Sequence, residues 1–258
     1  MNVGVELNKI WNEMRVYWFE LVFGNANTLI AFAGIYFAFQ VETKGVSAQV
    51  LFFFGVMFWY FGVHATDLVA LVMQEELEEG TLEQVLTSRS GIFSVMLGRV
   101  LAQLVVDACK ALPIFGLLFA LTGLGRSLRD VSQLVLILGL FGLSFLAMVG
   151  VGATIAGVAL VKKRVSSVGF ATTNFILYLS GLTIPLDQLP GWVTVLARAF
   201  PMSWAGDVLT AHLANDRRAM ALASLGLLMC SLLWVAVGGR VFAWGRTTAL
   251  VRGTTAQY

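Results

Sequence analysis

Stretches without a charged residue divide the chain into blocks of similar length. About 20 consecutive apolar residues are enough to cross the hydrocarbon core of a membrane as a helix. Five of the uncharged stretches reach that length, and a sixth reaches it when it is extended back to Val100. The pattern therefore predicts an all-α, polytopic membrane protein with six transmembrane helices. The uncharged stretches are residues 21–41, 45–66, 111–125, 131–161, 165–186 and 219–239.

The composition also indicates a membrane protein. Of the 258 residues, 58% are hydrophobic and 12% are charged, whereas about 25% of the residues of an ordinary soluble domain are charged. The mean hydropathy is +0.82. The sequence has no tandem repeat and no long hydrophilic block, so we expect a single transmembrane domain over residues 1–258. The first residues lack the pattern of a cleavable signal peptide, which predicts that the first span is a permanent anchor.

The charges of the connecting segments predict the orientation. Six spans place both termini on the same side of the membrane. With that side as the cytosol, ten Lys and Arg residues lie inside and six outside, and Lys110 lies within the membrane. Basic residues concentrate on the cytosolic side of membrane proteins. We therefore expect a multi-pass protein of the cell membrane with both termini cytosolic; Lys162, Lys163 and Arg164 contribute most to this bias.

The segment before the first span has the pattern of an amphipathic helix. In residues 1–22, apolar positions recur at spacings of three and four, and most charged residues fall on other faces. Trp11 and Trp18 suit the depth of the lipid head groups. We expect an amino-terminal interfacial helix here. The alternative is a cytosolic helix that packs on other parts of a protein.

The segment before the last span, residues 185–216, is too polar for a full crossing and too apolar for a solvated loop. Pro190 and Pro201 punctuate it, and proline disfavours the interior of a helix. The pattern predicts two short amphipathic helices, at 189–199 and 202–213. We expect them to be re-entrant or interfacial helices of the outer leaflet.

Motifs of known enzyme chemistry are absent from the sequence. It contains no G-x-x-x-x-G-K-[ST] phosphate loop and no G-x-S-x-G elbow. His64 and His212 are the only histidines, which excludes H-E-x-x-H and His-rich metal sites. Cys109 and Cys230 fall within predicted spans, so no disulfide framework is indicated. We predict no catalytic residue, no metal, no directly bound cofactor and no nucleic-acid partner.

Four ionisable side chains fall within the predicted spans, where they are costly and often functional. His64 and Asp67 are one turn apart in the second span, and Asp107 and Lys110 are one turn apart in the third. Each pair is spaced to neutralise itself on one helix. Two interpretations stay open. The pairs are structural and fix how the spans pack, or they form the polar lining of a substrate path or a charge-coupled gate.

The segment 74–90 is acidic, yet its local signals predict a helix-turn-helix. Gly80 suits the residue after a helix end, and Thr81 with Gln84 three residues later forms a capping box. The second span is therefore expected to continue into the cytosol, and a short helix follows from Leu82 with an apolar surface for a partner. The preceding carboxylates either steer that partner or only keep the segment in water.

Two stretches then resemble a known family. The stretch EEGTLEQVLTSRSGIFSVMLGRVLAQ resembles the Gly-Thr-Leu-Glu signature of type-2 ABC exporter permeases, and IPLDQLPGWVTVLARAFPMSWAGDVL is similar to the proline-rich outer segment of that family. The chain departs from the family pattern where Glu78 and Glu79 replace a basic residue and where Thr210 replaces an arginine. With six spans, the resemblance covers essentially the whole chain.

The resemblance implies partners and contact sites. It implies a transporter with two copies of a separate ABC ATP-binding subunit, which binds ATP and Mg, and with a second permease chain as a homodimer or heterodimer in the lipid bilayer. It also implies that a coupling helix docks on the ATPase and that Lys162, Lys163 and Arg164 form a second, smaller cytosolic contact. The coupling helix would comprise Gly80, Thr81, Leu82, Glu83, Gln84, Val85, Leu86, Thr87 and Ser88.

The expected function is therefore export of an amphipathic small molecule, a lipid or a lipid-linked glycan by alternating access. A rival from another class is a stand-alone secondary transporter driven by an ion gradient, with His64, Asp67, Asp107 and Lys110 as the coupling residues. Such a transporter often shows internal symmetry between its halves, which this sequence lacks. A third possibility is a structural subunit of a membrane complex.

Overall fold

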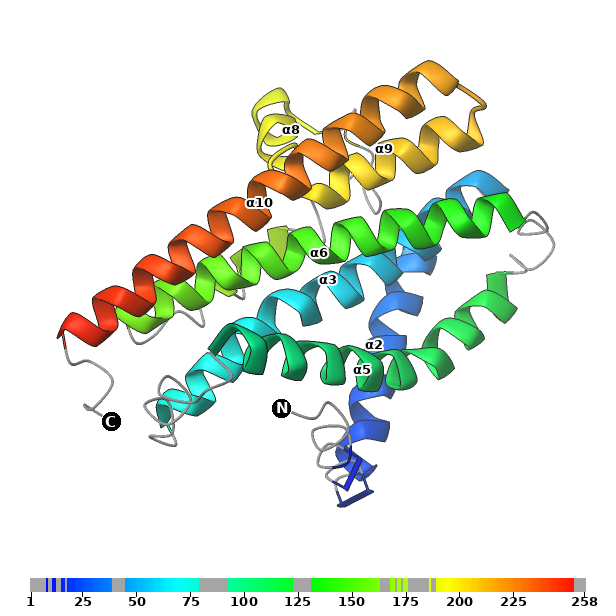
Figure 1. The fold of residues 1–258 in the computed structure, drawn as a ribbon. Coiled ribbons are helices and arrows are strands. Elements are labelled where there is room, and N and C mark those ends of the chain that lie inside the picture. The colour runs from blue at the N-terminus through cyan, green and yellow to red at the C-terminus, as the bar shows by residue number, and fades with distance from the viewer. Residues whose placement is uncertain are drawn as a thin grey trace.

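The computed structural model describes most of the chain as long helices (Figure 1). The described residues are 8, 11–12, 15–16, 18–38, 45–78, 92–122, 131–162, 168–169, 171–172, 174–175, 186 and 189–252. They contain no strand, which confirms the all-α class. The helices are α2 (Trp18–Ala38), α3 (Val46–Glu78), α5 (Ile92–Thr122), α6 (Val131–Lys162), α8 (Gly191–Ala197), α9 (Pro201–Leu213) and α10 (Arg217–Arg252).

Several helices are long and apolar enough to cross a membrane. In the described part of the chain, the candidates are Ser47–Thr66 in α3, Val135–Lys162 in α6 and Arg217–Ala249 in α10. The apolar part of α2, Val22–Ala38, is shorter, and α5 covers the expected third span as one helix. The expected fifth span, 165–186, lies mostly outside the described residues. The multi-pass class is thus confirmed, and the number of six spans stays a prediction.

The helices α6 and α10 lie side by side and run in the same direction (Figure 1). Three contacts repeat every seven residues, with a constant offset between the two helices. Ser231 donates a hydrogen bond of 3.4 Å to the carbonyl oxygen of Leu143. A Cβ added to Gly238 would lie 2.2 Å from the Gly150 carbonyl oxygen, and Gly245 meets Gly157 in the same way at 2.1 Å. The backbones therefore touch where no side chain intervenes, as small residues permit in membrane helices.

The helix α3 is parallel to the same pair. A Cβ at Gly62 would lie 3.5 Å from Cγ of Met148, and a Cβ at Gly152 would lie 2.6 Å from the Thr66 carbonyl oxygen. The two contacts are four residues apart on α3 and four residues apart on α6, which fixes the register between these two helices. By contrast, α2 and α5 run antiparallel to α3, as the ring contacts of Phe32 with Trp59 and of Tyr36 with Phe52 show for α2.

This register aligns the uncharged stretches of the three parallel helices. Residues 45, 131 and 219, where the stretches of α3, α6 and α10 begin, share one level along the bundle. The stretches of α3 and α10 also end together, at Thr66 and Gly239. Their 22 and 21 residues span about 32 Å, close to the thickness of a hydrocarbon core of about 30 Å. The alignment therefore defines a membrane slab across the bundle.

The uncharged stretch of α6 extends well past this slab. Beyond Gly152, the residues up to Val161 remain apolar, and most of them are buried, for example Ile155 at 6%, Ala159 at 4% and Leu160 at 3% exposure. The helix stays straight and projects beyond the membrane edge beside α10. Protein contact rather than lipid thus explains why this stretch is so long.

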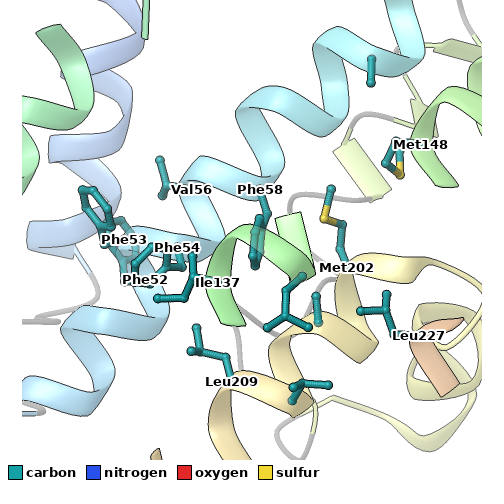
Figure 2. Packing of buried hydrophobic residues seen from close by; sticks show 14 of the residues in the cluster. Phe52, Phe53, Phe54, Val56, Phe58, Ile137, Met148, Met202, Leu209 and Leu227 are labelled. Atoms are coloured by element: carbon teal, nitrogen blue, oxygen red, sulfur yellow. The ribbon is translucent and has the colours of Figure 1, made fainter. Parts of the chain in front are cut away.

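Aromatic side chains fill the core between α3, α5, α6 and α9. Phe58 stacks on Phe141 with ring centroids 6.1 Å apart, and Phe53 meets Phe115 edge to face at 5.8 Å. Figure 2 shows Met202 of α9 reaching the same core beside Phe58. This packing holds α5 against α3 and so positions the polar residues that these two helices carry.

Candidate functional site

Three of the four ionisable residues predicted within the spans lie together where α3 faces α5. Asp107 Oδ2 lies 3.7 Å from His64 Nδ1, and its Oδ1 lies 3.9 Å from Lys110 Nζ. The Asp107 side chain is almost buried at 6% exposure, whereas those of Lys110 and His64 are 27% and 35% exposed. One carboxylate therefore stands between two basic groups from two helices. We call His64, Asp107 and Lys110 the polar cluster.

The cluster lies just inside one edge of the membrane slab. His64 is two residues before Thr66, where the uncharged stretch of α3 ends, so its Cα lies about 3 Å from that edge. A carboxylate in this position needs a partner, because an unpaired charge is expensive in a medium of low dielectric constant. Lys110 reaches towards the edge with a long side chain and neutralises Asp107 from there.

Two neighbours hold the cluster in place. The Tyr60 ring lies one turn before His64 and packs on the imidazole, with ring centroids 4.3 Å apart. Asn25 of α2 donates a hydrogen bond of 3.3 Å from Nδ2 to the backbone carbonyl oxygen of Lys110. The site therefore ties α2, α3 and α5 together at one level. It can transmit a displacement of one helix to the other two.

The structure shows one predicted pair and adds a contact that the sequence did not indicate. Asp107 and Lys110 pair on α5 as predicted. His64 also lies against Asp107 of the neighbouring helix. The Asp67 side chain lies outside the described residues, so its pair with His64 stays a prediction. A helical spacing identifies neighbours on one helix only. The sequence did offer one signal for the contact between helices, which is the helical spacing that places Tyr60, Phe61 and His64 on the side of α3 that faces α5.

A second polar group lies at the corner between α8 and α9. Arg198 pairs with Asp207, and its guanidinium carbon lies 4.7 Å from the centre of the Trp204 ring. Trp204 Nε1 donates a hydrogen bond of 3.0 Å to the Arg198 carbonyl oxygen. The sequence analysis named none of these side chains. The signal in the sequence for this ion pair was an Arg and an Asp nine residues apart, on either side of the break between two helices.

The corner is anchored at mid-depth of the slab. The indole Nε1 of Trp234 donates a hydrogen bond of 2.7 Å to the Ala199 carbonyl oxygen, and the Trp234 ring stacks on Phe200. Cys230, which also donates a hydrogen bond to the Ala199 carbonyl oxygen, lies next to the midpoint of the uncharged stretch 219–239, and Trp234 lies one turn further along. The two short helices that the sequence predicted are present, as α8 (Gly191–Ala197) and α9 (Pro201–Leu213). Asp216 then caps α10 through the backbone N–H groups of Arg218 and Ala219.

Most residues predicted to contact a partner lie outside the residues that the structure describes. The expected coupling helix, Gly80 to Ser88, lies outside the described residues, as do Lys163 and Arg164. The two helices that flank it are described: α3 continues to Glu78, as predicted, and α5 begins at Ile92. Lys162 is the exposed last residue of α6.

Parallel spanning helices, a neutralised charge at the membrane edge and a folded corner before the last helix define a polytopic helical membrane protein. The family model for the ABC-2 type transporter matches residues 5–213. The chain belongs to the ABC-2 type transporter family. It is therefore a membrane permease of ABC-type transport, a family whose membrane components associate with an ABC ATP-binding subunit and are generally not catalytic themselves. Comparison with curated proteins and with solved structures found no match.

Proposed function

We propose that this chain is the permease subunit of an ATP-driven exporter and is coupled to a separate ATPase through residues 80–88. The observation that carries the proposal is the length of α3. The helix continues for 12 residues beyond Thr66, to Glu78, which is about 18 Å past the membrane edge. The segment between α3 and α5 therefore starts well outside the lipid, where a soluble subunit can bind.

The direction of the helices supports six spans. Because α6 and α10 are parallel, Lys162 and Arg217 lie at opposite ends of the bundle. The chain between them must return along nearly the whole length of α6, and the uncharged stretch 165–186 is long enough to do so as a fifth span. The start of α2 and the end of α10 lie at the same end of the bundle, in agreement with two termini on one side. The bias of basic residues makes that side the cytosol.

The depth of the corner supports re-entrant rather than interfacial helices before the last span. Trp234 and Cys230 both donate hydrogen bonds to the Ala199 carbonyl oxygen, at 2.7 and 3.5 Å. Both residues lie more than ten positions after the start of the uncharged stretch of α10, which is the outer end of that stretch. The chain thus enters to about half of the membrane depth as α8 and leaves as α9. The exposed apolar side chains Trp192 and Val195 of α8 fit such an environment.

In the proposed mechanism, ATP binding closes two ATPase subunits and displaces the coupling helices. A shift of the 80–88 helix moves the cytosolic ends of α3 and α5 together, because the polar cluster ties the two helices near the membrane edge. The interface between two permease chains then opens outward. Nucleotide supplies the energy because it binds one of the two states more tightly. The cargo we propose is an amphipathic small molecule, a lipid or a lipid-linked glycan.

Replacing Leu82 with aspartate tests the docking site. The change puts a charge on the apolar surface that we assign to the ATPase, so the permease should lose at least about tenfold in affinity for its ABC ATP-binding subunit. Affinity is measured by co-purification and by titration in detergent. Glu83→Lys is expected to weaken the complex as well.

A matched control is Val251→Asp. Val251 is an 87% exposed apolar residue at the same end of the bundle, on α10, and its replacement should leave the affinity unchanged. If Leu82→Asp and Glu83→Lys bind the ATPase as well as the wild type does, the docking assignment is wrong.

A further inference from the structure

The last third of α10 carries a narrow strip of small residues on its exposed surface. Ala236, Gly239 and Ala243 follow one another at spacings of three and four, below the exposed side chain of Leu232. A Cβ added to Gly239 would meet no atom within 4 Å. The face of α10 that packs on α6 lies elsewhere, at Gly238 and Gly245. The strip is therefore a shallow apolar groove that the described part of the chain leaves open.

Two arginines border this groove. With 3.6 residues per turn, the side chain of Arg240 leaves the helix on one side of the strip and that of Arg246 leaves it on the other. Both arginines are exposed, and their Cα atoms are about 9 Å apart along the axis. Two side chains of this length can converge on one group placed over the strip. Trp244, 52% exposed, lies one turn after Arg240.

The depth of the arginines matches that of lipid head groups. Arg240 directly follows the uncharged stretch 219–239, so it lies at the edge of the membrane slab. Trp244 is about 6 Å further out and Arg246 about 9 Å further out. Tryptophan favours this interfacial layer. The groove between Leu232 and Gly239 lies on the hydrocarbon side of the same edge.

The positive charge of this face of α10 favours an anionic ligand. Neither α6 nor α10 contains an Asp or a Glu. No carboxylate within the described ranges pairs with Arg240 or Arg246, in contrast to Arg198, which pairs with Asp207. Two unpaired guanidinium groups separated by small residues suit the bidentate binding of a phosphate group.

We propose that this groove binds an anionic phospholipid. Its phosphate lies between Arg240 and Arg246, its head group lies beside Trp244, and one acyl chain follows the strip of Leu232, Ala236 and Gly239. The inference requires only that the chain is a membrane protein. It is independent of the docking of an ATPase, and the test below needs no ATPase.

The test compares lipid binding by the full-length protein and an Arg240→Gln, Arg246→Gln double variant. Delipidated protein in mild detergent is titrated with phosphatidylglycerol or phosphatidylcholine, and bound lipid is counted by native mass spectrometry. The double variant should lose roughly 30-fold in affinity for phosphatidylglycerol, because each basic residue near an anionic lipid contributes about fivefold. Its affinity for phosphatidylcholine should not change, which also reports that the variant is folded.

The matched control replaces Arg217 and Arg218 with glutamine. These arginines are exposed on the same helix, at its opposite end, and the affinity for phosphatidylglycerol should stay within about twofold of the wild type. Filling the strip with Ala236→Leu and Gly239→Leu should also weaken binding of this lipid, although both arginines remain.

Three results would overturn the proposal. The first is equal affinity of the wild type and the double arginine variant for phosphatidylglycerol. The second is equal competition by soluble glycerol phosphate, which would indicate a site for a free phosphate compound rather than a lipid. The third concerns an Ala243→Cys variant. If two copies of this variant form a disulfide, and phosphatidylglycerol does not reduce the yield of that disulfide, a second protein chain rather than a lipid covers the groove.

Discussion

Replacing Gly238 with leucine should strongly destabilise the protein. A Cβ at this position would lie 2.2 Å from the Gly150 carbonyl oxygen and 2.9 Å from its carbonyl carbon. Backbone atoms cannot rotate away, so the two helices must separate along a contact that repeats at Gly245. Overpacking of a close interface typically costs about 1–3 kcal/mol, and occasionally more. We expect a loss at the upper end of this range, seen as a Tm lowered by roughly 5–10 °C.

The neighbouring residue provides the control. Gly239 has no atom within 4 Å of an added Cβ and lies on the exposed face of the same helix. Gly239→Leu raises the helix propensity by the same amount as Gly238→Leu does, but its side chain does not contact α6. The Tm in detergent without added lipid should therefore stay near that of the wild type. Equal Tm values for the two variants would contradict the close approach of α6 and α10.

Replacing Asp107 with alanine should have an effect of similar size. The change leaves Lys110 and His64 without the carboxylate that lies 3.9 and 3.7 Å from them. Removal of one partner from a buried charge pair is strongly destabilising. Because the two basic groups are partly exposed, we expect a loss of about 2–4 kcal/mol in the free energy of unfolding, measured by thermal or chemical denaturation in detergent.

A double variant separates a structural role from a functional one. Asp107→Asn with Lys110→Met removes both charges, and it should recover most of the lost stability because no unpaired charge remains. If the cluster ties α3 to α5 during transport, the stable double variant should still show weakened coupling between ATP hydrolysis and movement of cargo. Normal coupling in that variant would restrict the cluster to a structural role. Asp207→Ala should also destabilise the protein, because it leaves Arg198 without its carboxylate at a depth inside the membrane slab.

The sequence predicted the helices well because uncharged length and periodicity are local properties. The stretches 45–66 and 219–239 lie within α3 and α10, and the two short helices before the last span begin and end within two residues of their predicted bounds. The long stretch 131–161 was harder to interpret. Its last third is apolar because the protein buries it beyond the membrane slab, and composition alone does not distinguish protein from lipid.

Contacts between helices could not be predicted from the sequence. The spacing of His64 and Asp67 predicts a pair on one helix only, and it gave no sign that His64 also contacts Asp107, 43 positions along the chain. The register of Gly150 with Gly238 is likewise not visible in the local sequence, because nothing there distinguishes the five glycines of α6 from one another. Gly139 and Gly142 meet no atom within 4 Å of an added Cβ, whereas Gly150, Gly152 and Gly157 meet the backbone of a neighbouring helix.

The central claim is that this membrane protein uses a separate ATPase rather than an ion gradient. It is tested most directly by reconstituting the chain in liposomes with and without its ABC ATP-binding subunit and measuring ATP hydrolysis and export of fluorescent amphipathic compounds. We predict that export requires both subunits and ATP, that it fails with Leu82→Asp, and that it survives collapse of the proton and sodium gradients. Gradient-driven transport by this chain alone, without ATPase or ATP, would contradict the account.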